Sequence, residues 1–409
     1  MTFRIFILWI FVLIGRPQDL IPELGQVRPA VILSLATLIS LVLSGEVSKN
    51  NSSIVMKSTL AKRYLLFFIV MVVGIPFAYH RRIAFEQVFL SYLVNMLFFF
   101  VFVLLVNSIE RLKAAILAIL FATFIYGIFT LIKGSFITGR FVTYGKMFDP
   151  NDIAYVLVSM FPIGLFYLAH KEGILKKIMA IITMASSVAV ILLTGSRGGA
   201  VSLLFVAILI LLINTGSIKR SQIVIFLAVM VVAAFYFRDK INFERYLTIT
   251  SLGEDYNVTS ETGRKQIWGR AFQLLLDNPL TGVGAGCFGM AIGYLRKDLD
   301  LIPEWQASHN SYLQIAAETG IIGFSFFASL IFRSFKSFSN LRKIDIQSPE
   351  ASQFKTLSGL LMVGFTGHLI AAFFLSQGYS IFFTLFFALS ATLNRIARPT
   401  HVKENVYTI

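Results

Sequence analysis

The chain has 409 residues, of which 56% are hydrophobic and only 14% are charged. About a quarter of the residues of a soluble domain are charged, so this shortfall excludes a soluble globular protein. The single cysteine excludes an intramolecular disulfide and a cysteine-based zinc site. In a soluble protein the formal net charge of +15 would suggest nucleic acid, but here we expect no nucleic-acid partner and consider where the charges lie relative to a membrane.

Apolar stretches recur along the whole chain. A transmembrane helix requires about 20 mostly apolar residues. No A-x-A cleavage site follows the first stretch, so we interpret it as a span and not as a signal peptide. The prediction is an all-α integral membrane protein with a single polytopic membrane domain, 1–409. The predicted spans are 3–15, 30–44, 64–79, 88–106, 113–132, 152–169, 178–194, 199–214, 221–237, 311–332, 356–375 and 379–394.

The distribution of charge predicts the orientation of these twelve spans. An even number of spans puts both termini on one side, and most Lys and Arg residues lie on that side, whereas most acidic residues lie on the other. The positive-inside rule therefore predicts that both termini are cytoplasmic. It places the long loop 238–310, between spans nine and ten, on the outer side.

The shorter outer loop, 133–151, ends in a helix-start signal. Asp149 is suited to the N-cap position, Pro150 to the first helical position and Asp152 to the favoured acidic position behind them. The simplest interpretation is a cap for the sixth span. A direct role in substrate binding is the alternative.

The long outer loop contains a predicted amphipathic helix, Arg264 to Asp277. Ile267, Trp268, Ala271 and Leu274 recur at helical spacing, and Asn278-Pro279 ends the pattern. The segment is too short and too charged to span a membrane. We expect it to lie on the membrane surface or to cover the helix bundle.

Arg197 lies between two spans with almost no connector. An arginine at that depth costs about 2.5 kcal/mol or more on insertion scales unless it faces a cavity or a partner. The two glycines that follow it open the next helix, whose amides favour an anion. Arg197 is therefore a candidate anion ligand, and an arginine that reaches the lipid head groups is the alternative.

Arg264 and His309 are the other candidates. A cation at the start of a helix opposes the helix dipole, so Arg264 is a second candidate anion ligand, or else a solvated or lipid-bound surface charge. His309 lies just before an apolar helix and is a candidate acid–base or hydrogen-bonding group, or else a structural residue. Asn310, Trp268 and Glu318 are candidate supporting residues; we expect Glu318 to lie three helical turns deeper in the membrane and to pair with an arginine or support packing.

Two arginines and a histidine without a carboxylate pair indicate phosphate chemistry. Arginines bind phosphate oxygens bidentately and neutralise a pyrophosphate leaving group, and a histidine can then activate or orient an attacking hydroxyl. The five histidines lack metal-ligand spacing and no acidic cluster is evident. We expect no metal and no other cofactor.

These motifs, in this order, resemble the bacterial O-antigen ligase and O-antigen polymerase superfamily of membrane-embedded glycosyltransferases. The likeness extends over about 140–330 at the level of motifs and over the whole chain at the level of topology. The motifs are RPQDLIP, FDPNDIA, TGSRGG, TGRKQIW followed by NPLTGVGAGCF, and HNSYLQIAAETGIIGF.

The resemblance implies transfer of a glycan from undecaprenyl pyrophosphate to an acceptor on the periplasmic side of the bacterial inner membrane. The acceptor is lipid A–core in the ligases and another lipid-linked repeat unit in the polymerases. By this likeness Arg197 and Arg264 bind the pyrophosphate and His309 positions or activates the acceptor hydroxyl. The reaction inverts the anomeric carbon and uses neither metal nor nucleotide sugar.

We favour the ligase, with the polymerase as the alternative, because the motifs look more like those of the ligase-type proteins. A flippase for the same lipid carrier is an alternative of another class. A transporter is expected to have charged residues in mid-span and broken helices along a path through both leaflets. In this chain the charged candidates gather at one face.

Overall fold

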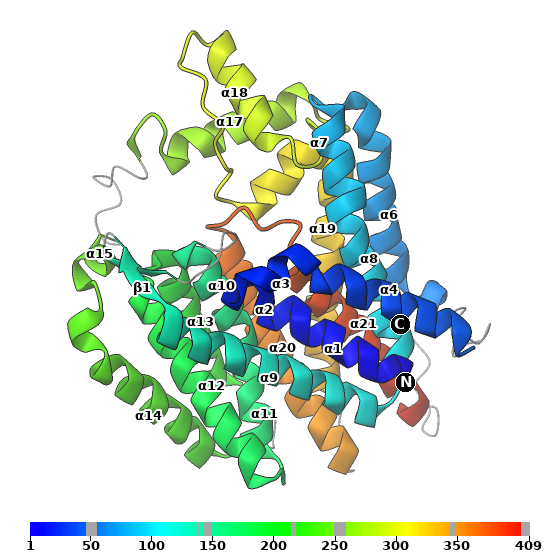
Figure 1. Cartoon of the computed structure of the whole chain (residues 1–409), viewed down its shortest axis with the longest axis vertical. Helices are drawn as coiled ribbons and strands as arrows, with labels where there is room; N and C mark the ends of the chain where they lie inside the picture. The colour runs from blue at the N-terminus through cyan, green and yellow to red at the C-terminus, as the bar shows by residue number, and fades with distance from the viewer. Residues whose placement is uncertain are drawn as a thin grey trace.

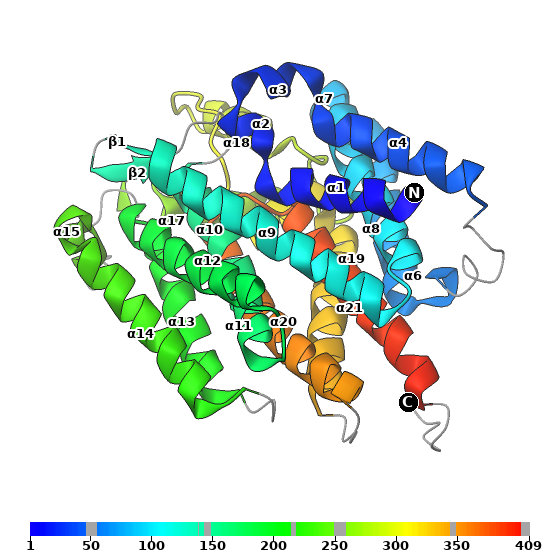
Figure 2. The same ribbon diagram turned by 60° about the horizontal axis from the view of Figure 1, so that its bottom comes forward.

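The computed structural model describes residues 1–45, 55–137, 139–142, 149–213, 218–248, 259–343 and 349–401. Most of these residues form one bundle of helices, in which α9, α12 and α14 lie side by side (Figure 2). A smaller part containing α17 and α18 stands above one end of the bundle (Figure 1). We call 259–308 the lobe and the end of the bundle beneath it the loop face.

The helices are α1 Thr2–Gly15, α2 Pro17–Leu20, α3 Pro22–Val27, α4 Pro29–Leu43, α6 Thr59–Gly74, α7 Arg81–Phe85, α8 Leu93–Leu105, α9 Ile109–Lys133, α10 Pro150–Met160, α11 Gly164–Ala169, α12 Ile174–Leu193, α13 Arg197–Leu212, α14 Arg220–Tyr236, α15 Phe243–Leu247, α17 Arg264–Asp277, α18 Phe288–Asp298, α19 Ser311–Arg342, α20 Pro349–Ala372 and α21 Ile381–His401. Short 3₁₀ turns are Ile75–Phe77, Phe161–Ile163 and Arg238–Lys240, and Glu86–Tyr92 is a π-helical turn.

The predicted spans are all helical in the described chain. Seven helical stretches are long and apolar enough to cross a membrane, and five shorter apolar helices occupy the other predicted positions. The protein is therefore a helical membrane protein. That the shorter helices also cross the bilayer, and that 238–310 is one outer loop, stay predictions; 249–258 lie outside the described residues.

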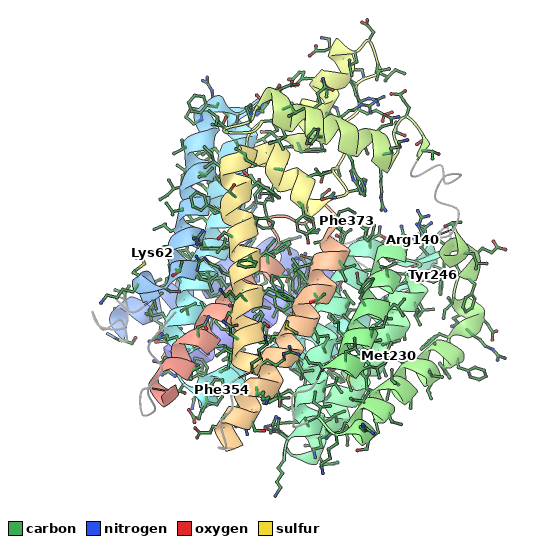
Figure 3. The ribbon with its side chains drawn as sticks, turned by 180° about the vertical axis from the view of Figure 1, so that it is seen from behind. Lys62, Arg140, Met230, Tyr246, Phe354 and Phe373 are labelled. Carbon is green, nitrogen blue, oxygen red and sulfur yellow. The ribbon has the colours of Figure 1, made fainter. Side chains whose placement is uncertain are left out.

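A small hairpin departs from the all-α prediction. β1 Ser135–Ile137 pairs antiparallel with β2 Arg140–Val142, and Phe136 lies opposite Phe141. The alternation of apolar and polar residues over these few positions was too short to distinguish from a loop. The hairpin brings Arg140 to the loop face, where Figure 3 shows it level with Tyr246 and Phe373.

Helix α19 is broken at Gly320, whose φ of 65° and ψ of −174° are not helical. Tyr312 and Phe332 line one groove, although a continuous helix would hold them about 30 Å apart. Residues 311–319 therefore fold back along 321–342, and Figure 3 shows the two arms of this yellow helix. The predicted span 311–332 is wrong in its first part, because a helical pattern does not reveal a reversal of direction at one glycine.

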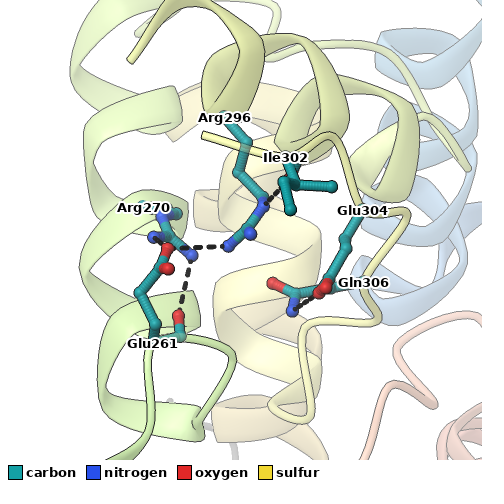
Figure 4. Close-up of polar contacts among 6 residues, drawn as sticks. All are labelled: Glu261, Arg270, Arg296, Ile302, Glu304 and Gln306. Carbon is teal, nitrogen blue, oxygen red and sulfur yellow. Dashed lines mark hydrogen bonds and ion pairs between the residues drawn. The ribbon is translucent and has the colours of Figure 1, made fainter. Parts of the chain in front are cut away.

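The lobe is held together by one carboxylate shared by two buried arginines. Arg270 Nη2 and Arg296 Nη1 donate to Glu261 Oε1 at 3.0 and 3.1 Å (Figure 4). Arg296 Nε also donates to the carbonyl of Ile302 at 2.7 Å. Because each guanidinium is buried, this shared carboxylate fixes α17 against α18. The amphipathic helix predicted from Arg264 to Asp277 is confirmed.

We expect Gly320→Ala to destabilise the protein. An alanine Cβ would overlap the carbonyl of Leu280, and this region of φ and ψ costs a non-glycine residue about 1–3 kcal/mol. The apparent Tm in detergent measures the loss. Gly269→Ala in α17 is the control: its Cβ meets nothing within 4 Å and alanine favours helix, so its Tm should be kept or raised. An unchanged Tm in Gly320→Ala would contradict the requirement for the break.

Candidate functional site

Arg197 begins α13 at the loop face and is half-buried. Ser196 caps the helix, and its Oγ accepts a hydrogen bond from the Gly199 amide at 3.2 Å. Arg197 Nη1 donates to Thr248 Oγ1 at 3.0 Å. Because Gly198 has no side chain, Phe374 packs directly against its backbone. Arg197 thus lies between the end of α15 and the connector 373–380 that joins α20 to α21.

Two further arginines, which the sequence did not single out, bind the turn before Arg197. Arg140 Nε donates to the carbonyl of Thr194 at 3.1 Å, and Arg245 Nε donates to the carbonyl of Gly195 at 2.8 Å. Burial and then the charge of Arg245 lower the pKa of Arg140, and Asp149 opposes this shift. The turn therefore carries a concentration of positive charge bound to backbone oxygens.

Arg264 interacts electrostatically with Arg140 and with His309. It begins α17 after Gly263, which provides no side-chain cap, and it is half-buried. Its charge contributes to the lowered pKa values of both Arg140 and His309. Arg264 is therefore close enough to Arg140 and His309 for its charge to affect both groups.

His309 occupies a strained turn at the base of α19. Its φ of 47° is left-handed, a conformation that a non-glycine residue adopts only when its surroundings impose it. Its amide donates to Ser376 Oγ at 2.8 Å, and Ser376 Oγ lies 2.9 Å from Ser308 Oγ. Burial and then Arg264 lower the pKa of His309, while Asp149 raises it. The imidazole is therefore neutral at pH 7.

Asn310 and Trp268 hold the backbone on either side of His309. Asn310 is buried and caps α19, with Oδ1 accepting from the amides of Tyr312 and Leu313 at 3.0 Å each. Trp268 Nε1 donates to the carbonyl of Ser308 at 3.1 Å. Both residues support the position of His309 without presenting a reactive group themselves.

Glu318 does not lie where the sequence suggested. Because α19 reverses at Gly320, Glu318 lies toward the lobe from His309 and not deeper in the bundle. Its carboxylate pairs with no described arginine; it accepts from the amides of Gly286 and Phe288 at 2.8 and 3.1 Å. The backbone of the same loop bonds to the broken helix through Val283 to Ala317 and Gly284 to Glu318. Glu318 therefore attaches the glycine-rich loop, residues 281–288, to α19.

The connector 373–380 links the arginine side of the site to the histidine side. Phe374 covers Gly198, Ser376 binds the turn at His309, and Gln377 Nε2 donates to Asp152 Oδ1 at 2.9 Å. Asp149 and Asp152 form the capping box predicted at the start of α10. The polar residues Ser376 and Gln377 between two apolar helices were the available signal in the sequence.

An apolar groove of about 330 Å³ lies between α19 and α20, and Tyr312, which follows His309 by three positions, is part of its lining. It is lined by Tyr312, Phe324, Ala328, Phe332 and Leu369, among others. The Tyr312 hydroxyl is engaged by the carbonyl of Leu369 at 2.6 Å, so it leaves the groove lining apolar. Among the described residues no three His, Cys, Asp or Glu side chains cluster as metal ligands.

Residues 181–328 match the family described as O-antigen ligase. The match covers a little over a third of the chain. The resemblance seen in the motifs is thereby confirmed, and the match supports a glycosyltransferase of the O-antigen ligase and polymerase type. All the predicted site residues fall within the matched segment 181–328, whereas Arg140 and the connector 373–380 lie outside it. No curated protein matches the chain.

The titration of His309 tests the geometry of the candidate site. Between its lowered pKa and the ordinary value of about 6.5 the unfolded chain binds more protons, so His309 makes stability fall as the pH falls through this window. NMR of ¹³C-labelled histidine, assigned with His309→Gln, should give a pKa below 6.5. We expect Arg264→Gln to raise this pKa and Asp149→Asn to lower it. Arg82→Gln, an exposed arginine paired with Glu86, should leave it unchanged. If Arg264→Gln left the pKa of His309 unchanged, this result would contradict the proximity of the two residues.

Proposed function

We propose that the protein transfers a glycan from undecaprenyl pyrophosphate to an acceptor hydroxyl at the loop face, as a ligase acting on lipid A–core. The observation that carries this proposal is the gathering of several arginines and a neutral histidine at one end of an apolar bundle, in a chain that matches the O-antigen ligase family over 181–328. The positive-inside rule puts this face on the periplasmic side of the inner membrane.

The arginines supply the charge that a pyrophosphate requires. Arg197 and Arg264 are the ligands we propose, and Arg140 and Arg245 add positive charge from the neighbouring turn. Arg140 Nε and Arg245 Nε each donate to a carbonyl oxygen of the Thr194–Gly195 turn, which holds both guanidinium groups at the loop face. Fixed cations in a partly dehydrated site stabilise the charge that develops on the leaving pyrophosphate.

The groove between α19 and α20 suits the lipid part of such a donor. Its apolar lining begins at Tyr312, three residues from His309, and continues along the lipid-facing part of α19. A donor with its pyrophosphate at the arginines can therefore keep its isoprenoid chain in the apolar layer, and no charged side chain of the bundle has to be displaced.

His309 provides the base in the proposed reaction. The acceptor hydroxyl oxygen attacks the anomeric carbon from the side opposite the pyrophosphate, and its proton passes to the neutral imidazole of His309. The bond between the anomeric carbon and the phosphate oxygen breaks, and the pyrophosphate leaves with the electron pair. This single displacement inverts the anomeric carbon. No metal or nucleotide sugar enters the proposed scheme.

We expect His309→Ala and Arg264→Ala each to reduce turnover by about 100-fold or more while leaving the protein folded, because they remove the base and one anion ligand. The assay mixes purified protein in detergent with lipid-linked glycan and lipid A–core. Arg82→Ala, at an exposed site on α7, is the matched control and should retain activity.

The same assay separates the alternatives. Near wild-type transfer by His309→Ala would refute its role as the base. Product on lipid A–core identifies a ligase, whereas lengthened lipid-linked glycan identifies a polymerase. Product of either kind in detergent, without two membrane sides, excludes a pure flippase.

Arg197→Lys tests bidentate binding of phosphate. Lysine keeps the charge but loses the planar fork of donors, so we expect turnover to fall by about 10-fold or more. Arg82→Lys is the control and should be neutral. Full activity of Arg197→Lys would mean that a point charge is sufficient at this position.

A further inference from the structure

Two aromatic side chains of the lobe and one from the turn before α7 lie together and are exposed. Tyr294 belongs to α18, Trp305 to the extended run 302–308, and Tyr79 to the turn before α7. The Tyr294 ring centroid lies 6.1 Å from that of Trp305 and 6.4 Å from that of Tyr79. Their exposed fractions are 43, 61 and 44% for Tyr294, Trp305 and Tyr79. We call these three residues the aromatic platform.

The platform is fixed by its surroundings despite its exposure. Trp305 packs on the bare backbone of Gly293, where any Cβ would overlap the indole ring. The Tyr79 amide donates to the carbonyl of Val283 at 2.9 Å. The run that carries Trp305 is held at Ile302 by buried Arg296 (Figure 4). Rings that are already ordered lose little entropy when a ligand binds.

Polar groups flank Trp305 on both sides. Gln306 Nε2 donates to Glu304 Oε2 at 2.8 Å (Figure 4). Gln306 Oε1 is buried and has no hydrogen-bond partner among the described residues. An acceptor without a protein partner can pair with a water or with a hydroxyl of a bound molecule.

The platform is continuous with the proposed reaction site. His309 follows Trp305 by four positions, so their Cα atoms lie at most about 14 Å apart. The end of the run is anchored where Trp268 Nε1 binds the carbonyl of Ser308. A chain that reacts at His309 and extends by a few sugar units along this run reaches the rings.

We propose that the aromatic platform binds the glycan chain of a substrate; the inference rests on the proposed function. Aromatic faces are electron-rich and attract the polarised C–H groups on one side of a sugar ring, while Glu304 and Gln306 accept bonds from hydroxyls.

Binding is tested on the full-length protein without any reaction. The chain has three tryptophans, so 5-fluorotryptophan gives three ¹⁹F resonances, assigned with Trp305→Phe. The probes are the oligosaccharide freed from the lipid-linked glycan by mild acid and, in a second arm, delipidated core oligosaccharide. We expect one of them to shift the Trp305 resonance saturably while buried Trp9 stays unchanged; the effective probe identifies the donor or the acceptor glycan.

Variants place the binding on the platform. Tyr294→Ala should weaken binding of the effective oligosaccharide at least fivefold and raise KM for a donor with several repeat units, with kcat retained. Tyr236→Ala, an equally bulky exposed tyrosine at the end of α14, is the control and should change neither. The effect on KM for a donor with one repeat unit should be smaller.

The outcomes separate the platform from the proposed function. Suppose that the wild-type protein transfers glycan, that neither oligosaccharide shifts the Trp305 resonance, and that Tyr294→Ala leaves KM unchanged. Glycan binding by the platform is then refuted. If the wild-type protein binds an oligosaccharide at Trp305 but transfers nothing, the platform stands and the proposed reaction fails. Quenching of Trp305 by a bilayer-embedded spin label would make the rings a membrane anchor and overturn the proposal.

Discussion

The reversal of α19 at Gly320 is the constraint on which the rest of the site depends. The break exposes backbone carbonyls of Ala317 and Glu318, which the glycine-rich loop satisfies through Val283 and Gly284. The Glu318 carboxylate adds to this attachment by accepting hydrogen bonds from the amides of Gly286 and Phe288. Without the break, α19 would run straight through the bundle, and the His309 turn and the lobe could not both adjoin its first arm.

The protein contains two arginine clusters whose hydrogen-bond partners differ. In the lobe, Arg270 and Arg296 both form ion pairs with Glu261. The carboxylate partly neutralises the two guanidinium groups and holds them in place. At the loop face, Arg140 and Arg245 donate to carbonyl oxygens of the Thr194–Gly195 turn. The first cluster joins two helices of the lobe, and the second brings positive charge to the turn that precedes Arg197.

The sequence predicted the features that depend on local pattern and missed those that depend on the meeting of distant segments. Hydropathy located every apolar helix, and periodicity gave α17 with its correct bounds. The capping residues at Asp149 were recognisable because the cap lies within four residues. Arg140, Arg245 and Ser376 escaped notice because each is a single polar residue whose partners lie about 50 to 70 positions away. The predicted depth of Glu318 was wrong because Gly320 reverses the direction of the helix.

The run 302–308 gives the proposed reaction a direction. One end is held by Arg296 in the lobe and the other by Trp268 next to His309, so the run connects the lobe to the proposed base. The apolar groove extends from Tyr312 along α19. In the proposed scheme the donor's isoprenoid chain and the glycan therefore depart from His309 on opposite sides. That separation keeps the apolar tail out of water and the sugars out of the bilayer while the pyrophosphate stays among the arginines between them.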